Sequence, residues 1–334
     1  MDPLTQGVLG ASLPQASAKS SEVRAAGLLG FLAGMSADLD VLIRSSADPL
    51  LFLEYHRQFT HALIFIPIGG LLCAALLYPL LGKSRQLSFA TCFKYCMLGY
   101  ATHALLDSCT TYGTMLFWPF SDVRIAWNTV SIIDPLFTGP ILVLVVLAAK
   151  KKREFYGRLA VLWALCYLSL GVLQRNAAVD MGNEIAVSRG HVPISLEAKP
   201  SFANILVWKT VYETQDRYYV DAVRVGPSPA VYQGDSIEKL DIARDFSWLD
   251  LDSQQARDIE RFRWFSNGYI AKDPLREDRI IDIRYSMVPN ELAPLWSIQL
   301  SKDASASDHV DYKTHRDTSS GQSDSLRRML FGGG

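Results

Sequence analysis

Six histidine and aspartate side chains, grouped in three short segments, have the types and spacing of a metal-binding site. They are Asp38 and Asp40, His56 and His61, and His103 and Asp107. His103 and Asp107 are four positions apart, so a helix would place both side chains on one face, one turn from each other. Imidazole nitrogens combined with carboxylate oxygens favour a divalent ion such as zinc, with manganese and iron as alternatives, over calcium.

The six candidate ligands are more than one closed tetrahedral ion requires. Two adjacent ions would use them all, and so would one ion with a carboxylate that acts as a base. We assign Asp40 as that base, in addition to its place among the ligands. Arg57, next to His56, is expected to bind an anionic group or to orient a ligating carboxylate. The alternative roles are helix capping for Asp38 and Asp40 and interfacial anchoring for Arg57.

The elements that must position these residues are apolar helices. Five stretches are candidates to cross a bilayer, which takes about 20 residues. They are residues 25–43, 61–82, 89–106, 132–149 and 157–173, and a shorter stretch at 4–18 is a candidate half-helix packed among them. Residues 1–175 therefore predict an α-helical membrane bundle of about five or six helices.

Clusters of Lys and Arg indicate which ends of these stretches face the cytoplasm, because cytoplasmic loops are enriched in both residues. The clusters lie at residues 19–24, 83–94 and 150–158, and an even number of apolar stretches separates neighbouring clusters. All three clusters can therefore face the cytoplasm together. This orientation brings the three segments with the candidate ligands to the opposite, outer surface, where they would meet.

Residues 176–300 predict a soluble α+β domain with a small antiparallel sheet, on the outer side of the membrane. β-rich runs separated by Pro and Gly occur at residues 205–212, 218–225, 279–285 and 295–300, and residues 250–265 have helical spacing. The tail 301–334 is rich in Ser, Asp, Lys and Gly, so we expect it to be disordered.

The charge and the cysteine content of the chain argue against a nucleic-acid partner and against structures held by cysteines. A net charge of -1 with scattered Lys and Arg lacks the basic field of a nucleic-acid-binding protein, so no nucleic-acid partner is expected. The five cysteines form no CxxC pair, and neither a disulfide framework nor a thiolate zinc site is expected.

A second segment on the outer side contains three further candidates, Asp122, Arg124 and Asp134, for substrate contact or for support of the metal ligands. The aromatic residues of the same segment, Trp118 and Trp127, suit a membrane interface.

These segments resemble the family of bacterial membrane-bound metal-dependent hydrolases described as LexA-regulated inner-membrane proteins. The matching elements cover most of residues 1–140, and they are Met1-Asp-Pro-Leu-Thr-Gln-Gly7, Ala37-Asp-Leu-Asp40, His56-Arg-Gln-Phe-Thr-His61, Thr102-His-Ala-Leu-Leu-Asp107, Thr111-Tyr-Gly-Thr114, Trp118-Pro-Phe-Ser-Asp122 and Ile133-Asp-Pro135. The resemblance implies that the six histidines and aspartates are metal-binding positions and that Asp2 is an additional acidic position. Many members of that family have histidine where this chain has Gln6, and because an amide is a poor zinc ligand, the site is expected to be altered there.

The expected function is a multi-pass hydrolase of the bacterial inner membrane that cleaves an ester or phosphoester of a lipid, a lipid-linked molecule or another small molecule. Water activated by the ion would attack, an aspartate would accept the proton, and Arg57 would stabilise the developing oxyanion. A metal-binding transporter or sensor is the main alternative, but it predicts polar groups deep in the helices, whereas the centres of 61–82 and 136–149 are almost purely apolar. A third alternative makes the helices an anchor for a partner-binding outer domain. No oligomeric state is predicted.

Overall fold

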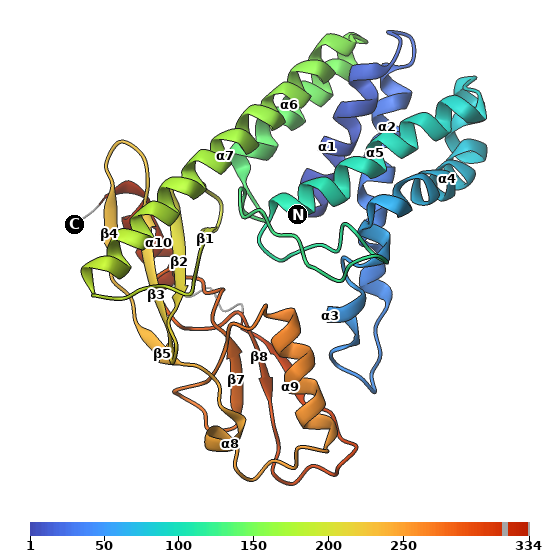
Figure 1. Ribbon diagram of the computed structural model, residues 1–334. Coiled ribbons are helices and arrows are strands. Elements are labelled where there is room, and N and C mark those ends of the chain that lie inside the picture. The colour runs from blue at the N-terminus through green and yellow to red at the C-terminus, as the bar shows by residue number, and fades with distance from the viewer. Residues whose placement is uncertain (316–319, 333–334) are drawn as a thin grey trace. The chain divides into compact units, whose positions relative to one another are not determined.

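The computed structural model describes residues 1–315 and 320–332, and the chain divides into two compact units (Figure 1). The N-terminal unit consists of Met1–Leu42, Tyr55–Leu173 and Phe202–Asn204, and the C-terminal unit consists of Ile43–Glu54, Gln174–Ser201 and Ile205–Gly334. The sequence predicted one boundary near residue 175. The structure adds an exchange of segments, because residues 43–54, between two of the candidate ligand segments, fold with the C-terminal unit.

The N-terminal unit is a bundle of helices. Its helices are α1 (Pro3–Ser17), α2 (Val23–Ser36), α4 (Ile66–Leu77), α5 (Phe89–Cys109), α6 (Pro135–Lys151) and the first part of α7 (Glu154–Ser188). Helix α1 packs against α2, α5 and α6, and α5 also packs against α2 and α4. Helix α5 begins where the Ser88 hydroxyl accepts a hydrogen bond from the Thr91 backbone N–H, which satisfies one of the free donors of its first turn.

Small residues allow α1, α2 and α5 to approach closely. A Cβ atom added to Gly99 of α5 would lie 2.5 Å from the carbonyl oxygen of Gly30 on α2. A Cβ added to Gly10 of α1 would lie 2.6 Å from the same oxygen. Such contacts are typical of helices packed in a membrane, where small residues bring backbones together. They also fix the end of α2 beside the end of α5, where the candidate ligands lie.

Three helical segments in the described part of the chain are long and apolar enough to cross a membrane: Val23–Leu42, Leu63–Arg85 and Glu154–Ser188. The structure thus supports three of the five or six expected crossings by length and composition. Helix α6 has 17 residues, fewer than the roughly 20 that span a bilayer. Helix α5 has 21 residues, but Lys94, His103 and Asp107 lower its hydropathy.

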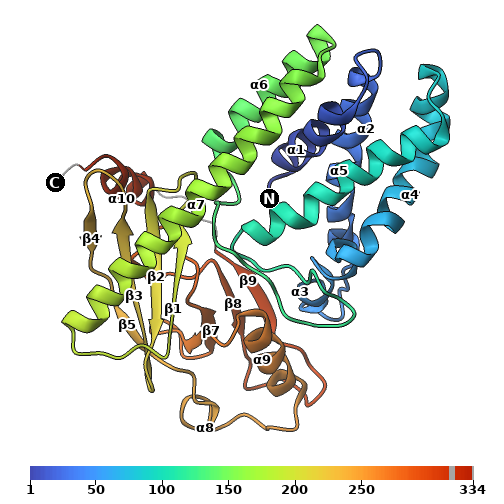
Figure 2. The ribbon, with the colours of Figure 1, turned by 45° about the horizontal axis from the view of Figure 1, so that its top comes forward.

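The C-terminal unit contains two antiparallel sheets where the sequence predicted one (Figure 2). The first has the order β1-β2-β3-β4, with β5 also paired to β3, and its strands are Ser195–Pro200, Val207–Glu213, Arg217–Arg224, Ala230–Tyr232 and Ser236–Glu238. The second has the order β6-β7-β8-β9, with strands Ile270–Lys272, Arg279–Asp282, Trp296–Gln299 and Asp311–Thr314. The helices of this unit in the described chain are α3 (Leu51–Tyr55), the second part of α7 from Gln174 onward, α8 (Ile242–Asp245), α9 (Gln254–Phe265) and α10 (Ser320–Phe331).

The prediction of a disordered tail is wrong for two segments of the described chain. Strand β9 pairs with β8, and Met329 of α10 is buried with Val207 and Ala222 of the first sheet. The prediction relied on the average composition of the tail, which is polar, and so missed single apolar residues such as Met329 that are buried. Residues 316–319 and 333–334, which the prediction also covered, lie outside the described residues.

The core of the second sheet is completed by α9 and by the exchanged segment. Helix α9 buries Ile259 and Phe262 against Ile280 and Ile298 of the sheet, and its opposite face is charged, as its sequence period predicts. Leu50, from the exchanged segment, is fully buried in the same cluster.

Candidate metal centre

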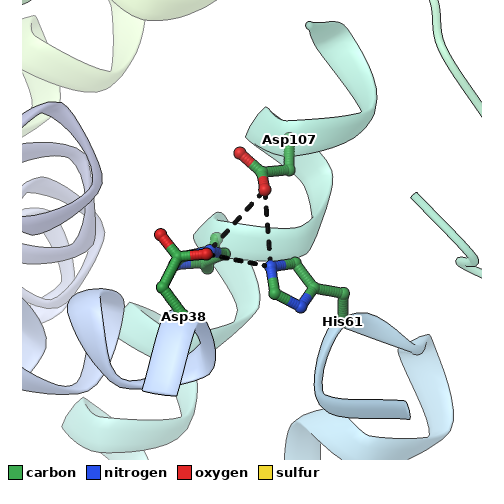
Figure 3. A group of neighbouring side chains, drawn as sticks. Asp38, His61 and Asp107 are labelled. Atoms are coloured by element: carbon green, nitrogen blue, oxygen red, sulfur yellow. Dashed lines mark ion pairs between the residues drawn. The ribbon is translucent and has the colours of Figure 1, made fainter. Parts of the chain in front are cut away.

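Four of the predicted ligands converge at one point of the N-terminal unit. Asp38 comes from the 3₁₀-helix Ala37–Leu42 that continues α2, His61 comes from the 3₁₀-helix Phe59–His61, and His103 and Asp107 lie one turn apart on α5. Figure 3 shows the side chains of Asp38, His61 and Asp107 pointing toward one another from these separate elements. One donor atom from each of the four residues lies within 4.8 Å of all the others.

The distances among these donors suit a shared cation. His61 Nε2 lies 3.5 Å from Asp38 Oδ1 and 3.4 Å from Asp107 Oδ2. His103 Nε2 lies 3.3 Å and 3.8 Å from the same two oxygens. His61 Nε2, His103 Nε2 and Asp107 Oδ2 are buried, and none has a hydrogen-bond partner among the described residues. Asp107 Oδ2 does have an ion-pair partner, Arg57 Nε at 3.0 Å, but the two imidazole nitrogens face the same point without a hydrogen bond, which is unusual for buried polar atoms and is the arrangement expected of a cation site.

In both His61 and His103, a hydrogen bond at Nδ1 orients the ring so that Nε2 faces the other candidate ligands. His103 Nδ1 donates to the carbonyl oxygen of Gly34 at 2.5 Å, which leaves Nε2 to face the centre. His61 Nδ1 lies 2.9 Å from the Thr60 hydroxyl, which in turn donates to Asp40 Oδ2 at 2.7 Å. Metal-binding histidines commonly donate their second N–H in this way, because the contact fixes the tautomer and the orientation of the ring.

Asp40 lies beside His61 Nδ1, on the side of the ring away from the other candidate ligands, and its carboxylate accepts several hydrogen bonds. Its Oδ2 accepts from the Arg57 backbone N–H at 3.0 Å as well as from Thr60, and its Oδ1 lies 2.8 Å from His56 Nδ1. Asp38, Asp40 and His56 form a second group with metal-binding spacing, which shares Asp38 with the first. The structure therefore brings all six predicted residues together, with four facing one point and Asp40 and His56 adjoining it.

Arg57 adds a buried positive charge to the centre. Its Nε lies 3.0 Å from Asp107 Oδ2, and its Nη1 donates to the Thr110 hydroxyl at 3.1 Å. The residue has φ +65°, a left-handed conformation that is uncommon for an arginine. The Met115 N–H donates to the Arg57 carbonyl and the Arg57 N–H donates to Asp40, so both backbone groups help to hold this conformation.

The electrostatic environment favours positive charge at the centre. Burial alone would lower the pKa of His61, which lies just before the span Leu63–Arg85, but the carboxylates of Asp107, Asp38 and Asp40 raise it to about 10. Burial is the main cause that lowers the pKa of His56. The carboxylates thus outweigh the desolvation of the innermost histidine, as expected where a cation is to be bound.

The four additional candidates lie outside both metal-spaced groups of the described chain. Asp2 caps α1 by accepting from the Thr5 N–H, and Asp134 caps α6 by accepting from two backbone N–H groups. Asp122 is exposed in a loop, and Arg124 donates to the carbonyl oxygens of residues 112 and 113. Asp2 and Asp134 are therefore helix caps, Asp122 and Arg124 are loop residues, and none of the four belongs to the metal-spaced groups of the described chain.

Three supporting groups were not foreseen from the sequence: the Gly34 carbonyl, the Thr60 hydroxyl and the Gln6 amide. Gln6 is buried, and its Nε2 donates to Asp107 Oδ1 at 2.7 Å, an oxygen that also contacts the Met1 nitrogen. Gln6 thus contacts a candidate ligand through a hydrogen bond. Two signals in the sequence could have identified supporting groups: the position of Thr60 beside His61, and Gln6 at a position where many members of the resembled family have histidine.

Comparison with known proteins gives the chain a family. Residues 1–178, which hold the whole helical unit apart from its short return at Phe202–Asn204, match the family described as YdjM inner membrane protein. The chain belongs to this family. It is therefore an inner membrane protein of bacterial type with several apolar helices, as the resemblance implied. The family description states no activity.

A curated relative agrees with this assignment. Over 108 residues the chain is 30% identical to the inner membrane protein YbcI of Escherichia coli (strain K12). The match covers 31% of this chain and 60% of the relative, so the chain spans less than two thirds of that protein. No solved structure matches the chain.

Proposed function

We propose that this YdjM-family protein is a metal-dependent hydrolase of the inner membrane that cleaves an ester or phosphoester of a lipid or lipid-linked molecule. The observation that carries the proposal is the convergence of His61 Nε2, His103 Nε2 and Asp107 Oδ2, three buried atoms without a hydrogen-bond partner in the described chain. Two imidazoles with two carboxylates, and no thiol, favour zinc, with manganese or iron as alternatives.

Asp38, His61, His103 and Asp107 would hold the ion. When bound, a divalent ion supplies Lewis acidity and activates water for attack. The Asp38 and His56 side chains are 25% and 28% exposed, whereas the other candidate ligands are buried. Substrate and water would enter beside these two side chains. A second ion at Asp38, Asp40 and His56 is compatible with the spacing of those residues.

Asp40 and His56 would handle the proton released from water. Asp40 is fully buried and its oxygens already accept several hydrogen bonds, so His56, which is partly exposed and contacts Asp40 Oδ1, is better placed to meet the proton first. Asp40 would orient His56 and stabilise its charged form. This revises the assignment of Asp40 as the base itself.

Arg57 would act on charge in two ways. Its contact with Asp107 lowers the net negative charge of the ligand set, and its guanidinium, held beside the centre, would stabilise the charge that develops on the substrate oxygen.

Three basic clusters that can share the cytoplasmic side support an extracytoplasmic C-terminal unit and a centre at the outer membrane surface. A lipid or lipid-linked substrate would be directly accessible there.

The test compares the full chain, purified in detergent and loaded with zinc, with His103→Ala. Wild type should cleave a phospholipid or a generic phosphoester, and His103→Ala should lose at least 100-fold in turnover. His191→Ala, in the C-terminal unit, is the matched control and should retain wild-type turnover. Equal turnover in wild type and His103→Ala would rule out the proposed catalysis. Zinc binding without turnover on any ester would favour the metal-binding transporter or sensor.

A further inference from the structure

The segment that lies between Asp40 and His56 in the sequence folds as part of the C-terminal unit. Residues 43–54 begin three positions after Asp40 and end two positions before His56. Leu50 and Leu53 of this segment are buried with Ile259 and Phe262 of α9. The chain therefore leaves the helical unit directly after one part of the metal centre, enters the core of the other unit, and returns directly before the next part.

A single arginine of α9 clamps both halves of this segment. Arg261 donates to Asp48 from Nη1 and Nη2, at 3.0 Å and 2.8 Å, a bidentate pair. Its Nε donates to Glu54 Oε1 at 2.5 Å. Its Nη1 also lies 2.8 Å from Asp258, whose other oxygen contacts His309 Nδ1 at 2.8 Å. A planar guanidinium can hold two carboxylates at fixed angles, which a lysine cannot do.

The clamp acts close to the metal centre along the chain. Glu54 precedes His56 by two residues and Arg57 by three, and Arg57 needs an unusual backbone conformation to place its N–H on Asp40. Fixing Glu54 limits the conformations that the next three residues can sample. On the Asp40 side, Arg261 fixes Asp48, which follows Asp40 by eight positions, and Leu50 is buried against α9.

We infer that Arg261 is a positioning residue for the metal centre: by clamping Asp48 and Glu54, it fixes the segment that joins Asp40 to His56 and Arg57. This inference rests on the metal-binding half of the proposed function and is independent of hydrolysis.

The experiment measures zinc affinity of the full chain in detergent by competition with a chromophoric chelator. Arg261→Gln removes the clamp, and zinc affinity should fall at least tenfold. Arg263→Gln is the matched control, because Arg263 lies on the same helix and pairs with the exposed Glu260. It should bind zinc as wild type does. Arg261→Lys, which keeps the charge without the fork, should restore only part of the affinity.

A role in folding alone would leave zinc affinity unchanged in the fraction that remains folded. A folded Arg261→Gln protein with wild-type zinc affinity would overturn the inference. If Arg261→Gln does not fold, Glu54→Gln decides, because Glu54 is partly exposed and its loss removes one arm of the clamp. Wild-type affinity in Glu54→Gln would then refute the clamp. Failure of wild type to bind zinc would refute the metal centre too, whereas zinc binding without turnover would affect the proposed hydrolysis alone.

Discussion

Asp40 Oδ2 lies 3.3 Å from His61 Nδ1, while His61 Nε2 faces the other candidate ligands. Asp40 and the Thr60 hydroxyl, 2.9 Å from the same nitrogen, thus hold one side of the ring and leave Nε2 free for an ion. The same carboxylate accepts from Thr60 and from the Arg57 N–H, so it also fixes the backbone that carries His61. A carboxylate behind a histidine in this arrangement is typical of metal sites.

Asp40→Asn should weaken zinc binding by roughly 10- to 100-fold, because the amide cannot accept from all of the donors that face Asp40. Competition titration of the full chain measures this change. Asp303→Asn, an exposed aspartate of the C-terminal unit, serves as the control. Unchanged affinity in Asp40→Asn would remove Asp40 from the support of the centre.

Arg57→Met should destabilise the zinc-free protein more than the zinc-loaded protein. Loss of the guanidinium removes one of the two cations that pair with the buried Asp107 carboxylate and leaves the Met1 ammonium, so the cost should be below the about 3–5 kcal/mol of a buried carboxylate that loses its sole partner. Zinc would neutralise the same carboxylate and offset much of that cost. Thermal unfolding with and without a chelator tests this prediction, and an equal fall in Tm under both conditions would contradict it.

Stability of the C-terminal unit should rise with pH through the titration of Lys209. Burial lowers the pKa of Lys209 to about 7, although Ser286 and the Glu291 carbonyl accept from its Nζ. The unfolded chain keeps the ordinary pKa of 10.5, so it binds more protons than the folded chain between pH 7 and pH 10.5, and the free energy of unfolding increases over that range. The contribution is on the order of 5 kcal/mol.

Lys209→Met isolates that contribution, because methionine has similar length and no charge. Unfolding is measured by tryptophan fluorescence. From pH 7 to pH 10, the free energy of unfolding of wild type should increase relative to that of Lys209→Met. Parallel pH profiles for the two proteins would show that Lys209 stays charged in the folded state and would contradict the prediction.

The convergence of the candidate metal ligands was predictable because their spacing is local and their neighbours are apolar. The four-residue spacing of His103 and Asp107 required one helix face, and α5 provides it. The positions of Asp38 and His61 followed from charge patterning, which brought the ends of different helices to one surface. Periodicity also identified α9 and the strands β2, β3, β7 and β8.

Residues whose roles depend on distant partners were not predictable. Asp48 and Arg261 are 213 positions apart, and nothing in either sequence neighbourhood marks the other. Asp134 follows an apolar run and could equally contact substrate or cap a helix, and only the backbone N–H groups of α6 decide for the cap. Of the five or six expected spans, three are supported by length and composition, while α6 is shorter than a typical span and polar residues lower the hydropathy of α5.

The most direct test of the metal centre is zinc K-edge X-ray absorption of the zinc-loaded full chain. A zinc ion held by Asp38, His61, His103 and Asp107 should show nitrogen and oxygen ligands at roughly 2.0–2.2 Å, outer-shell scattering from two imidazoles, and loss of one imidazole in His61→Ala. Sulfur at about 2.3 Å, or an imidazole signal that His61→Ala and His103→Ala leave unchanged, would contradict this ligand set.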